Sequence, residues 1–439
     1  DFFRHPMNET GDTPAWLTAG YDRIWMPYTQ MQTAPLPQAA VATEGSRITL
    51  SDGRELIDGV ASWWAACHGY NHPHIVEAIR DQAAKMPHIM LAGLANEPAF
   101  TLAQRFAAFA PDPDYRVFFS ESGSVSVEVA LKIAAQFWHN KGETTRKKFL
   151  CFRGGYHGDT FATMALCDPV DGFHAAFQGV VPGQLIADLP QDDATEAALD
   201  ALFAEHGKTI AAVIVEPLVQ GAGGMLFHAP QTLQRLRRLC DAHGLLLVFD
   251  EIFAGLGRLG TMLAGQRAGV APDILTLSKT LTGGTLPLSA TLASGRVFEA
   301  FQSDRLEDCL MHGPTFTGNA LACAAANASL DLFETEPRLD QVKALEAALG
   351  PALAPCRDMP GVKDVRAQGA IGVVELDIGG FEELVWLRQR FVDEGVFIRP
   401  FSNIVYLTPA YNIAADDLAR LTDAILTVVP EWAACFGKK

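Results

Sequence analysis

Two residues able to do chemistry each end a buried apolar run. Lys279 ends "ILTLSK" (274–279), and Asp250 ends "LLLVFD" (245–250). The chain between the two runs is long enough for a crossover between parallel strands, which needs at least ~10–12 residues. Both side chains are therefore predicted to emerge at the carboxyl edge of one parallel sheet, where open α/β folds bind their ligands.

A lysine and a carboxylate at such an edge are what a pyridoxal phosphate site requires. The lysine forms a Schiff base with the cofactor, and the carboxylate keeps the ring nitrogen protonated so that the ring accepts electrons. A salt bridge that closes two strand ends explains these two residues equally well, so the pair alone leaves both interpretations open.

Two further segments favour a cofactor site. In "SESGSVSVEVALKIAAQFW" (120–138), Gly123 and Ser124 lead into a long apolar helix, and the free N–H groups of a helix start attract anions such as phosphate. The simpler alternative is an ordinary N-cap at Ser122. In "FRGGYHGDT" (152–160), Tyr156 lies on a glycine-flexed loop where its ring could stack on a flat cofactor. Taken alone, this tyrosine would be assigned to the core.

These residues need a parallel sheet to position them, and the middle of the chain has its pattern. Apolar runs separated by helical stretches indicate an α/β sheet covered on both faces. "LSATLAS" (288–294) follows Lys279 after only a glycine turn, so it is predicted to be an antiparallel neighbour. The predicted strands span 115–122, 148–155, 211–218, 245–252, 274–279 and 288–294, and the predicted helices include 125–138 and 230–242.

The pattern changes after about residue 330. Strands are predicted at 369–377, 395–401 and 403–409, near helices at 339–354 and 415–428, as in a smaller α+β domain. We expect an N-terminal segment (1–60) that packs with the small domain (331–439), and a large cofactor-binding domain between them (61–330).

The overall composition excludes some partners. With 34 basic and 51 acidic residues, the net charge of −17 argues against nucleic acid or an anionic membrane as a partner. No apolar run reaches the ~18 residues of a membrane helix, and "DFFRHPMNETGDTPAWL" (1–17) lacks the pattern of a secretory signal. The scattered cysteines form no CxxC pair. A cytoplasmic protein with free thiols is expected.

Three motifs together carry a family resemblance. "VIVEPLVQGAGGM" (213–225), "LLLVFDEI" followed by "GLGR", and "LTLSKTLTGG" (275–284) resemble the class III pyridoxal-phosphate aminotransferases of fold type I. That resemblance implies a large domain with a mostly parallel seven-stranded sheet, a smaller α+β domain, pyridoxal 5'-phosphate as cofactor, and a homodimer with shared active sites.

Four more segments resemble a narrower group within that family. They are "WMPYTQM" (25–31), "DGVASWWAACHGYNHP" (58–73), "FRGGYHGDTFATMALCDP" (152–169) and "MHGPTFTGNALACAAANASL" (311–330). The narrower resemblance implies amino transfer from S-adenosylmethionine to 8-amino-7-oxononanoate, which gives 7,8-diaminononanoate in biotin biosynthesis. The alternative is another class III ω-amine:oxo-acid aminotransferase with a different donor.

The family pattern implies a role for each matching residue. Lys279 binds the cofactor and moves the proton, Asp250 pairs with the ring nitrogen, and Tyr156 stacks on the ring. The other cofactor-binding residues implied are Gly123, Ser124 and Ile252, with Pro314 and Thr315 supplied by the second subunit. The substrate-binding residues implied are Tyr28, Trp63, Trp64, Asp159, Arg258, Gly313, Arg399 and Tyr406, with Arg399 as the partner of the substrate carboxylate.

The segment after Asp250 departs from the family pattern. It reads "IFAGLGRLG" (252–260), so Phe253 and Leu259 are expected to add bulk near the cavity and to affect substrate preference. "GLGRLG" also matches the GxGxxG fingerprint of a dinucleotide-dependent oxidoreductase. However, the first glycine comes too late after the strand, and the next acid, Asp273, comes too early.

Two aromatic and histidine clusters remain. Trp63 and Trp64 are interpreted as neighbours on a strand-like segment, so that one faces a cavity or a subunit interface. "HGYNHPH" (68–74) crowds three histidines, but Pro73 is expected to force a loop and no complete ligand set is nearby. A structural turn and no metal are therefore expected there.

Overall fold

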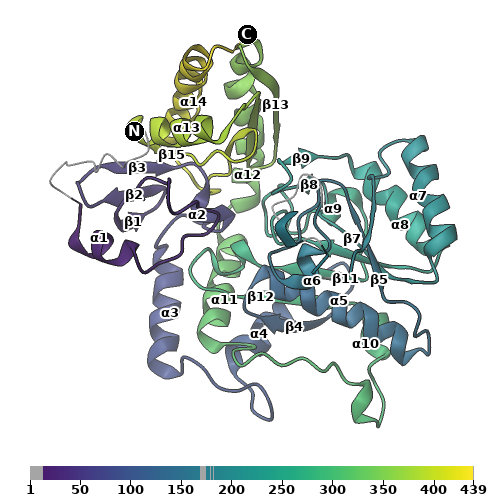
Figure 1. The fold of residues 1–439 in the computed structure, drawn as a ribbon. Coiled ribbons are helices and arrows are strands. Elements are labelled where there is room, and N and C mark those ends of the chain that lie inside the picture. Colours follow the sequence, from purple (N-terminus) through teal and green to yellow (C-terminus); the bar gives the residue numbers. More distant parts are fainter. Residues whose placement is uncertain (1–12, 169–174, 178, 181, 439) are drawn as a thin grey trace.

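The computed structural model (Figure 1) describes residues 13–168, 175–177, 179–180 and 182–438. The stretch considered for a secretory signal lies mostly outside these residues. No helix of the described ranges is long and apolar enough to cross a membrane.

Within the described residues, the largest sheet has seven strands, and it confirms the predicted α/β class. β12 is antiparallel to both of its neighbours, as predicted for "LSATLAS", whereas β10 pairs in parallel with β7 and β11. In sheet order the strands are β4 (Arg116–Ser120), β12 (Ser289–Ala293), β11 (Ile274–Leu277), β10 (Leu246–Asp250), β7 (Ile210–Val215), β5 (Lys148–Phe152) and β6 (Leu185–Ala187).

Side chains alternate between the two faces of this sheet along each strand, and both faces are apolar, so helices cover both of them. In β7, Ala212 and Ile214 pack in one cluster with α5 (Gly123–Asn140). Val213 and Val215 pack in another cluster with α7 (Asp193–His206) and α8 (Pro230–Ala242). The predicted helix 230–242 thus matches α8, and α5 is slightly longer than the predicted 125–138.

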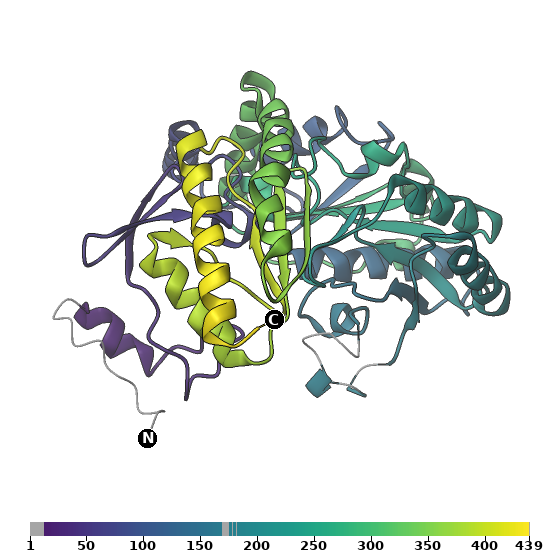
Figure 2. The same ribbon diagram turned by 90° about the horizontal axis from the view of Figure 1, so that it is seen from above.

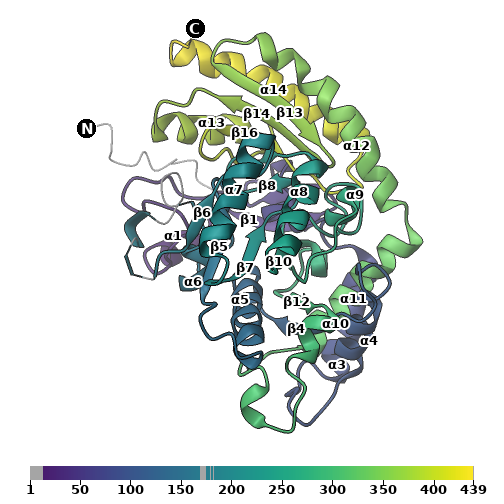
Figure 3. The same ribbon diagram turned by 90° about the vertical axis from the view of Figure 1, so that its right-hand side faces the viewer.

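Two smaller sheets lie beside the large one. β13 (Val362–Gln368), β14 (Ile371–Leu376) and β16 (Ile404–Leu407) form an antiparallel sheet next to α12 (Arg338–Leu353) and α14 (Ala415–Cys435), as Figures 2 and 3 show. The predictions missed β13 and ended the last helix too early, because α14 continues through Pro430.

Strands from distant parts of the chain make up the third sheet. It runs β1 (Ala40–Glu44), β2 (Arg47–Leu50), β3 (Glu55–Asp58) and β15 (Val396–Phe397), and β15 pairs in parallel with β3. The N-terminal strands therefore contact the segment that carries Arg399. The division of the chain into domains at residues 60 and 330 stays a prediction.

The other elements connect these sheets. A two-stranded ribbon is formed by β8 (Val219–Gln220) and β9 (Leu226–Phe227). The remaining α-helices are α1 (Ala15–Tyr21), α2 (Ala61–Trp64), α3 (Pro73–Lys85), α4 (Glu97–Phe106), α6 (Phe161–Met164), α9 (Gly265–Ala268), α10 (Gly295–Glu299), α11 (Ala320–Thr335) and α13 (Phe381–Asp393).

A turn precedes Pro73, as predicted, but the loop does not extend through Pro73 itself. Pro73 is the first residue of α3, a position where its fixed φ and missing N–H suit a helix. The nearby histidines have separate partners, since His68 contacts Ser329 and Arg338 while His74 pairs with Asp331. Among the described residues, no group of three or more His, Cys, Asp or Glu side chains is placed to hold a metal ion.

Candidate active site

Lys279 begins a short 3₁₀ turn (Lys279–Thr282) directly after β11, with φ at 40°. Its Nζ lies 4.4 Å from the centroid of the Trp64 ring and 5.4 Å from that of Phe253. The surrounding hydroxyls hold the turn: Ser278 donates to the Leu288 carbonyl. Burial lowers the pKa of Lys279 to about 8, against the opposing effect of Asp250, because the rings remove water from the ammonium.

Asp250 ends the neighbouring strand β10, and it pairs in register with Thr276 of β11. Its buried carboxylate accepts a hydrogen bond from Nδ1 of His157 at 2.7 Å and one from the backbone N–H of Ile252 at 3.1 Å. His157 is itself buried, so the pair is shielded from water. The aspartate is thereby fixed in one orientation at the carboxyl edge of the sheet.

A second buried acid, Glu216, follows strand β7 and also lines the cavity. It accepts hydrogen bonds from the N–H groups of Tyr156 and Gly221 at 3.0 and 2.9 Å. Burial raises the pKa of Glu216 to about 7. Sequence reasoning missed Glu216 and His157, although Glu216 follows an apolar strand just as Asp250 ends one.

The first turn of α5 forms a cradle of backbone N–H groups, against which the loop at Gly158 packs. Gly123 and Ser124 occupy the first turn of α5, where N–H groups have no partner within the helix, and both line the cavity. Gly158 has φ at +129°, and a Cβ there would lie 2.2 Å from Oγ of Ser124. The close approach of the loop to the helix start therefore depends on this glycine.

One cavity of about 610 Å³ brings most of the predicted site residues together. The predicted residues that line it are Tyr28, Trp63, Trp64, Gly123, Ser124, Tyr156, Asp159, Asp250, Ile252, Lys279, Arg399 and Tyr406. Residues from the N-terminal part of the chain (Tyr28, Trp63 and Trp64), the large sheet and the C-terminal segment thus meet around Lys279.

A carboxylate and two phenols form a network on one side of this cavity. The hydroxyl of Tyr28 donates to Asp159 at 2.5 Å, and that of Tyr156 donates to the same carboxylate oxygen at 2.8 Å. Burial raises the pKa of Tyr28 to about 12 and raises that of Tyr156 as well. Both phenols therefore stay protonated donors at neutral pH.

The strand-like conformation expected for the two tryptophans is wrong. They lie in the short, kinked segment α2, where Ala61, Ser62 and Trp64 all have positive φ. This turn places both rings at the cavity: Trp64 is buried and donates from Nε1 to the hydroxyl of Tyr406 at 3.1 Å. Trp63 is exposed, and the guanidinium of Arg399 lies 5.4 Å from its ring centroid.

Four predicted site residues do not line the cavity of the single chain. Arg258 is fully buried behind the cavity wall, where it donates to the carbonyls of Pro409 and Trp64. The segment that contains Gly313, Pro314 and Thr315 runs elsewhere on the surface, beside the exposed side chains of Met311 and Phe316.

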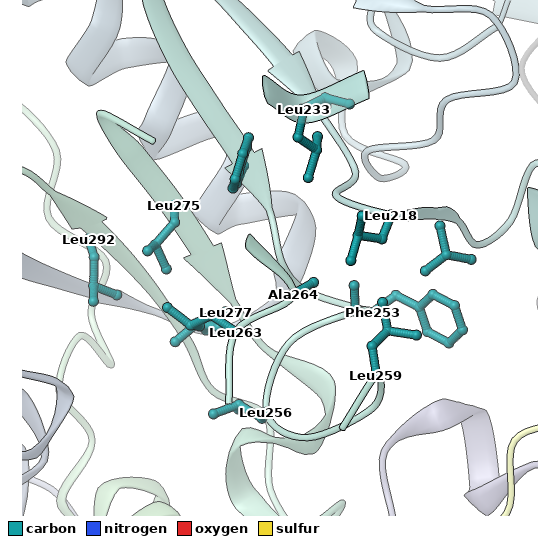
Figure 4. Packing of buried hydrophobic residues seen from close by; sticks show 14 of the residues in the cluster. Leu218, Leu233, Phe253, Leu256, Leu259, Leu263, Ala264, Leu275, Leu277 and Leu292 are labelled. Carbon is teal, nitrogen blue, oxygen red and sulfur yellow. The ribbon is translucent and has the colours of Figure 1, made fainter. Parts of the chain in front are cut away.

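The two bulky residues after Asp250 have different places. Phe253 lines the cavity and packs on Trp64 with ring centroids 4.6 Å apart. Leu259 does not line the cavity, so the expectation that its side chain adds bulk there is wrong. It packs among the buried leucines shown in Figure 4. "GLGRLG" itself lies in consecutive turns and does not open a helix, so it lacks the geometry of a dinucleotide fingerprint.

These residues fit pyridoxal phosphate. A half-buried lysine with a lowered pKa, a fixed aspartate on an adjacent strand, and a glycine-dependent cradle at a helix start all open into the same cavity. A Cβ at Gly123 would lie 3.0 Å from Ile252, so that wall is closely packed as well. The sheet order and this site define a pyridoxal-phosphate enzyme of fold type I.

Comparison with known proteins agrees with this assignment. The chain belongs to the class III aminotransferase family, whose model matches residues 28–429. Pyridoxal 5'-phosphate is its cofactor, and its activity is that of an aminotransferase. A solved amine transaminase from an uncultivated Pseudomonas species, in a pyridoxal-phosphate-bound form, has a TM-score of 0.85 and 31% identity, covering 93% of this chain and 98% of its own.

Several curated relatives share one name. Adenosylmethionine-8-amino-7-oxononanoate aminotransferases from Mycobacterium leprae and Synechococcus elongatus are each 41% identical to this chain, and cover 92% and 94% of it and 94% and 99% of their own lengths. The crystal structure of the Methanocaldococcus jannaschii protein of that name has a TM-score of 0.89 and 29% identity, with coverage of 94% and 98%.

Proposed function

We propose that this aminotransferase transfers an amino group from S-adenosylmethionine to 8-amino-7-oxononanoate and so makes 7,8-diaminononanoate, a step of biotin biosynthesis. The observation that carries the proposal is that Lys279, Asp250 and Arg399 all line the same cavity. Relatives of about this length and 41% identity carry the corresponding name.

We propose that Lys279, Asp250 and Tyr156 are the catalytic residues, and that the cofactor is held by these three together with Ile252 and the Gly123–Ser124 cradle. Bound pyridoxal phosphate supplies an electron sink for the carbanion formed when the substrate α-carbon loses a proton. Lys279 is the base: with its pKa near 8, a neutral amine is available to take that proton and return it. Its aromatic neighbours, Trp64 and Phe253, keep water away from the transferred proton.

Asp250 would keep a proton on the ring nitrogen of the cofactor, since its carboxylate lines the cavity at the end of the strand next to that of Lys279. His157 holds that carboxylate through a hydrogen bond of 2.7 Å. This hydrogen bond leaves the Asp250 side chain little freedom to rotate. Its carboxylate is therefore already oriented to accept a hydrogen bond from the ring nitrogen before the substrate binds. Tyr156, held by Asp159 at 2.8 Å, is proposed to keep its ring against the cofactor.

The walls of the cavity suit both substrates. Ring faces attract cations and also accept apolar chains, so Tyr28, Trp63 and Trp64 can contact a sulfonium in one half-reaction and an aliphatic chain in the other. Arg399, which lies over Trp63, is proposed to bind the substrate carboxylate in a bidentate manner. Asp159 and Tyr406 complete the proposed substrate site.

We further propose that the enzyme acts as a homodimer in the cytoplasm and binds neither nucleic acid nor a membrane. Gly313, Pro314 and Thr315 would then reach the active site of the other subunit. Their position beside exposed Met311 (65%) and Phe316 (54%) supports an interface there. Buried Arg258 is proposed to act on the substrate through the Trp64 carbonyl that it holds. The free cysteines, most of them buried, fit a reducing compartment.

Phe253 favours a second candidate, a class III aminotransferase with a different amino donor, because its ring narrows the cavity beside Lys279. A donor screen decides between the two. The cofactor-loaded enzyme is mixed with S-adenosylmethionine, lysine or ω-amines, and the loss of its visible absorbance is followed; 8-amino-7-oxononanoate is then added and 7,8-diaminononanoate is measured by mass spectrometry. We expect 7,8-diaminononanoate to form with S-adenosylmethionine and with none of the other amines. Its formation with another amine but not with S-adenosylmethionine would contradict the proposed donor.

A further inference from the structure

Helix α13 presents one face to the active-site cavity. Phe381, Leu384 and Arg388 all line the cavity, and their spacing of three and four residues puts them on the same side of the helix. Two of these side chains are apolar and the third is cationic. The face thus offers an apolar wall that ends in a charge, a pattern suited to a long chain with an anionic end.

Arg388 is held in place beside Arg399. Its Nε and Nη2 both donate to the carbonyl of Pro400, at 3.0 and 2.8 Å, which fixes one edge of the guanidinium against the residue that follows Arg399. In the part of the chain that the structure describes, Nη1 has no hydrogen-bond partner. The opposite edge of the fork is therefore available to a ligand.

Neither arginine is neutralised by the protein. Within the described ranges, neither of these two guanidiniums forms an ion pair, whereas Arg390, which follows two positions later, pairs with Glu394 and Glu431. Burial and the nearby charge of Arg399 lower the pKa of Arg388 to about 10, so it remains protonated at neutral pH. Two adjacent, half-buried cations repel one another, and an anion between them would relieve that repulsion.

The acids that line the cavity act on Lys279 rather than on Arg388. The acids that act most on Lys279 are Asp250, Glu216 and Asp159, while the charge that acts most on Arg388 is that of Arg399. The cavity accordingly has an acidic end at the lysine and a cationic end at the arginines.

We propose that Arg388 is a specificity-determining residue that, together with Arg399, binds the remote carboxylate of a long-chain oxo acid. This rests on the proposed function and deepens it. In an α-amino-acid donor the carboxylate adjoins the reacting carbon, so it belongs near Lys279. In the acceptor a chain of methylenes separates the two groups, and the wall of Phe381 and Leu384 would contact that chain. Arg388 therefore discriminates in favour of the acceptor.

The test compares Arg388→Gln with the matched control Arg390→Gln on the far side of the same helix. Calorimetry measures the binding of nonanoate and of nonanamide to the cofactor-loaded enzyme, and steady-state kinetics gives KM and kcat for each substrate. Arg388→Gln should weaken nonanoate binding roughly ten-fold, because it removes a charged hydrogen bond, and should leave nonanamide unaffected. The acceptor KM should rise in parallel, with the donor KM and kcat nearly unchanged, and Arg390→Gln should behave as the parent.

Unchanged nonanoate affinity in Arg388→Gln would overturn the proposal, as would an equal loss for nonanoate and nonanamide, which would indicate a damaged wall. Arg388→Lys, which keeps the charge without the fork, should bind nonanoate with intermediate affinity, and it serves if the glutamine variant fails to fold. Failure of the proposed function is distinguishable: the parent enzyme would then not convert 8-amino-7-oxononanoate, while the nonanoate measurement would still report on Arg388.

Discussion

At the scale of single residues, the site depends on how each charge is desolvated. Lys279 is surrounded by rings, Asp250 by a histidine and a backbone N–H, and Glu216 by two backbone N–H groups. Asp250 and Glu216 are buried and Lys279 is half-buried, but only the lysine lacks a fixed hydrogen-bond partner among these contacts. It is therefore the group best able to move between a cofactor and a substrate.

Replacing Lys279 by alanine should abolish amino transfer and leave the fold intact. The lysine is the proposed base, and a half-buried cation without an ion-pair partner among the described residues stabilises the structure little, so removing it should not lower the midpoint of thermal unfolding. Turnover is measured with both substrates present, and circular dichroism checks the fold. Turnover at the parent rate would exclude Lys279 as the base.

The lowered pKa of Lys279 gives a pH dependence with a definite sign. Only the neutral amine can attack the cofactor aldehyde, so the rate at which apoenzyme incorporates pyridoxal phosphate should rise with pH and level off above about pH 8. The rate is measured from visible absorbance after mixing at a series of pH values. A rate that keeps rising up to the ordinary lysine pKa of 10.5 would contradict the desolvation by Trp64 and Phe253.

His157 should matter through Asp250. His157→Ala leaves the buried carboxylate without its 2.7 Å partner, so kcat should fall by roughly ten-fold or more while cofactor is still bound. His157→Asn, which can still donate a hydrogen bond, should recover part of that loss. Equal kcat in the parent and the alanine variant would show that the contact does not serve catalysis.

At the scale of elements, the cradle depends on a loop that approaches the start of α5. Gly158→Ala should impair cofactor retention, because its Cβ would collide with Ser124 and its φ of +129° is unfavourable for alanine. Gly142→Ala is the control, since Gly142 also has a positive φ (+82°) but a Cβ added there would meet no atom within 4 Å. Retained pyridoxal phosphate is measured after dialysis; equal retention in both variants would contradict the cradle.

The sequence predicts elements better than it predicts conformations at the site. Apolar periodicity predicts α8, and the short glycine turn after Lys279 predicts that β12 is antiparallel to β11. The sequence does not predict the turn at Trp63 and Trp64. Three residues there adopt positive φ, and none of them is a glycine that would signal such a conformation. The contact of His157 with Asp250 was also missed, because only the folded sheet brings these two residues together.

At the scale of the whole molecule, the proposed dimer makes a distinctive prediction. Lys279→Ala and Thr315→Glu should each be inactive, the second because an acid would repel the cofactor phosphate. If each site takes its lysine from one subunit and its threonine from the other, refolding an equal mixture should restore about one quarter of the parent activity, in the mixed dimers. No recovery in a mixture that forms mixed dimers would mean that the sites are not shared.

The pairing of β3 with β15 has a consequence for biogenesis. The strand at Glu55–Asp58 leaves the ribosome long before its partner at Val396–Phe397 is synthesised. Until β15 is made, one edge of β3 is unpaired. Arg399, which is proposed to bind the substrate carboxylate, has not yet been synthesised at that stage. A chain that stops before β15 should therefore have no catalytic activity. Its unpaired strand edge should instead make it bind chaperones.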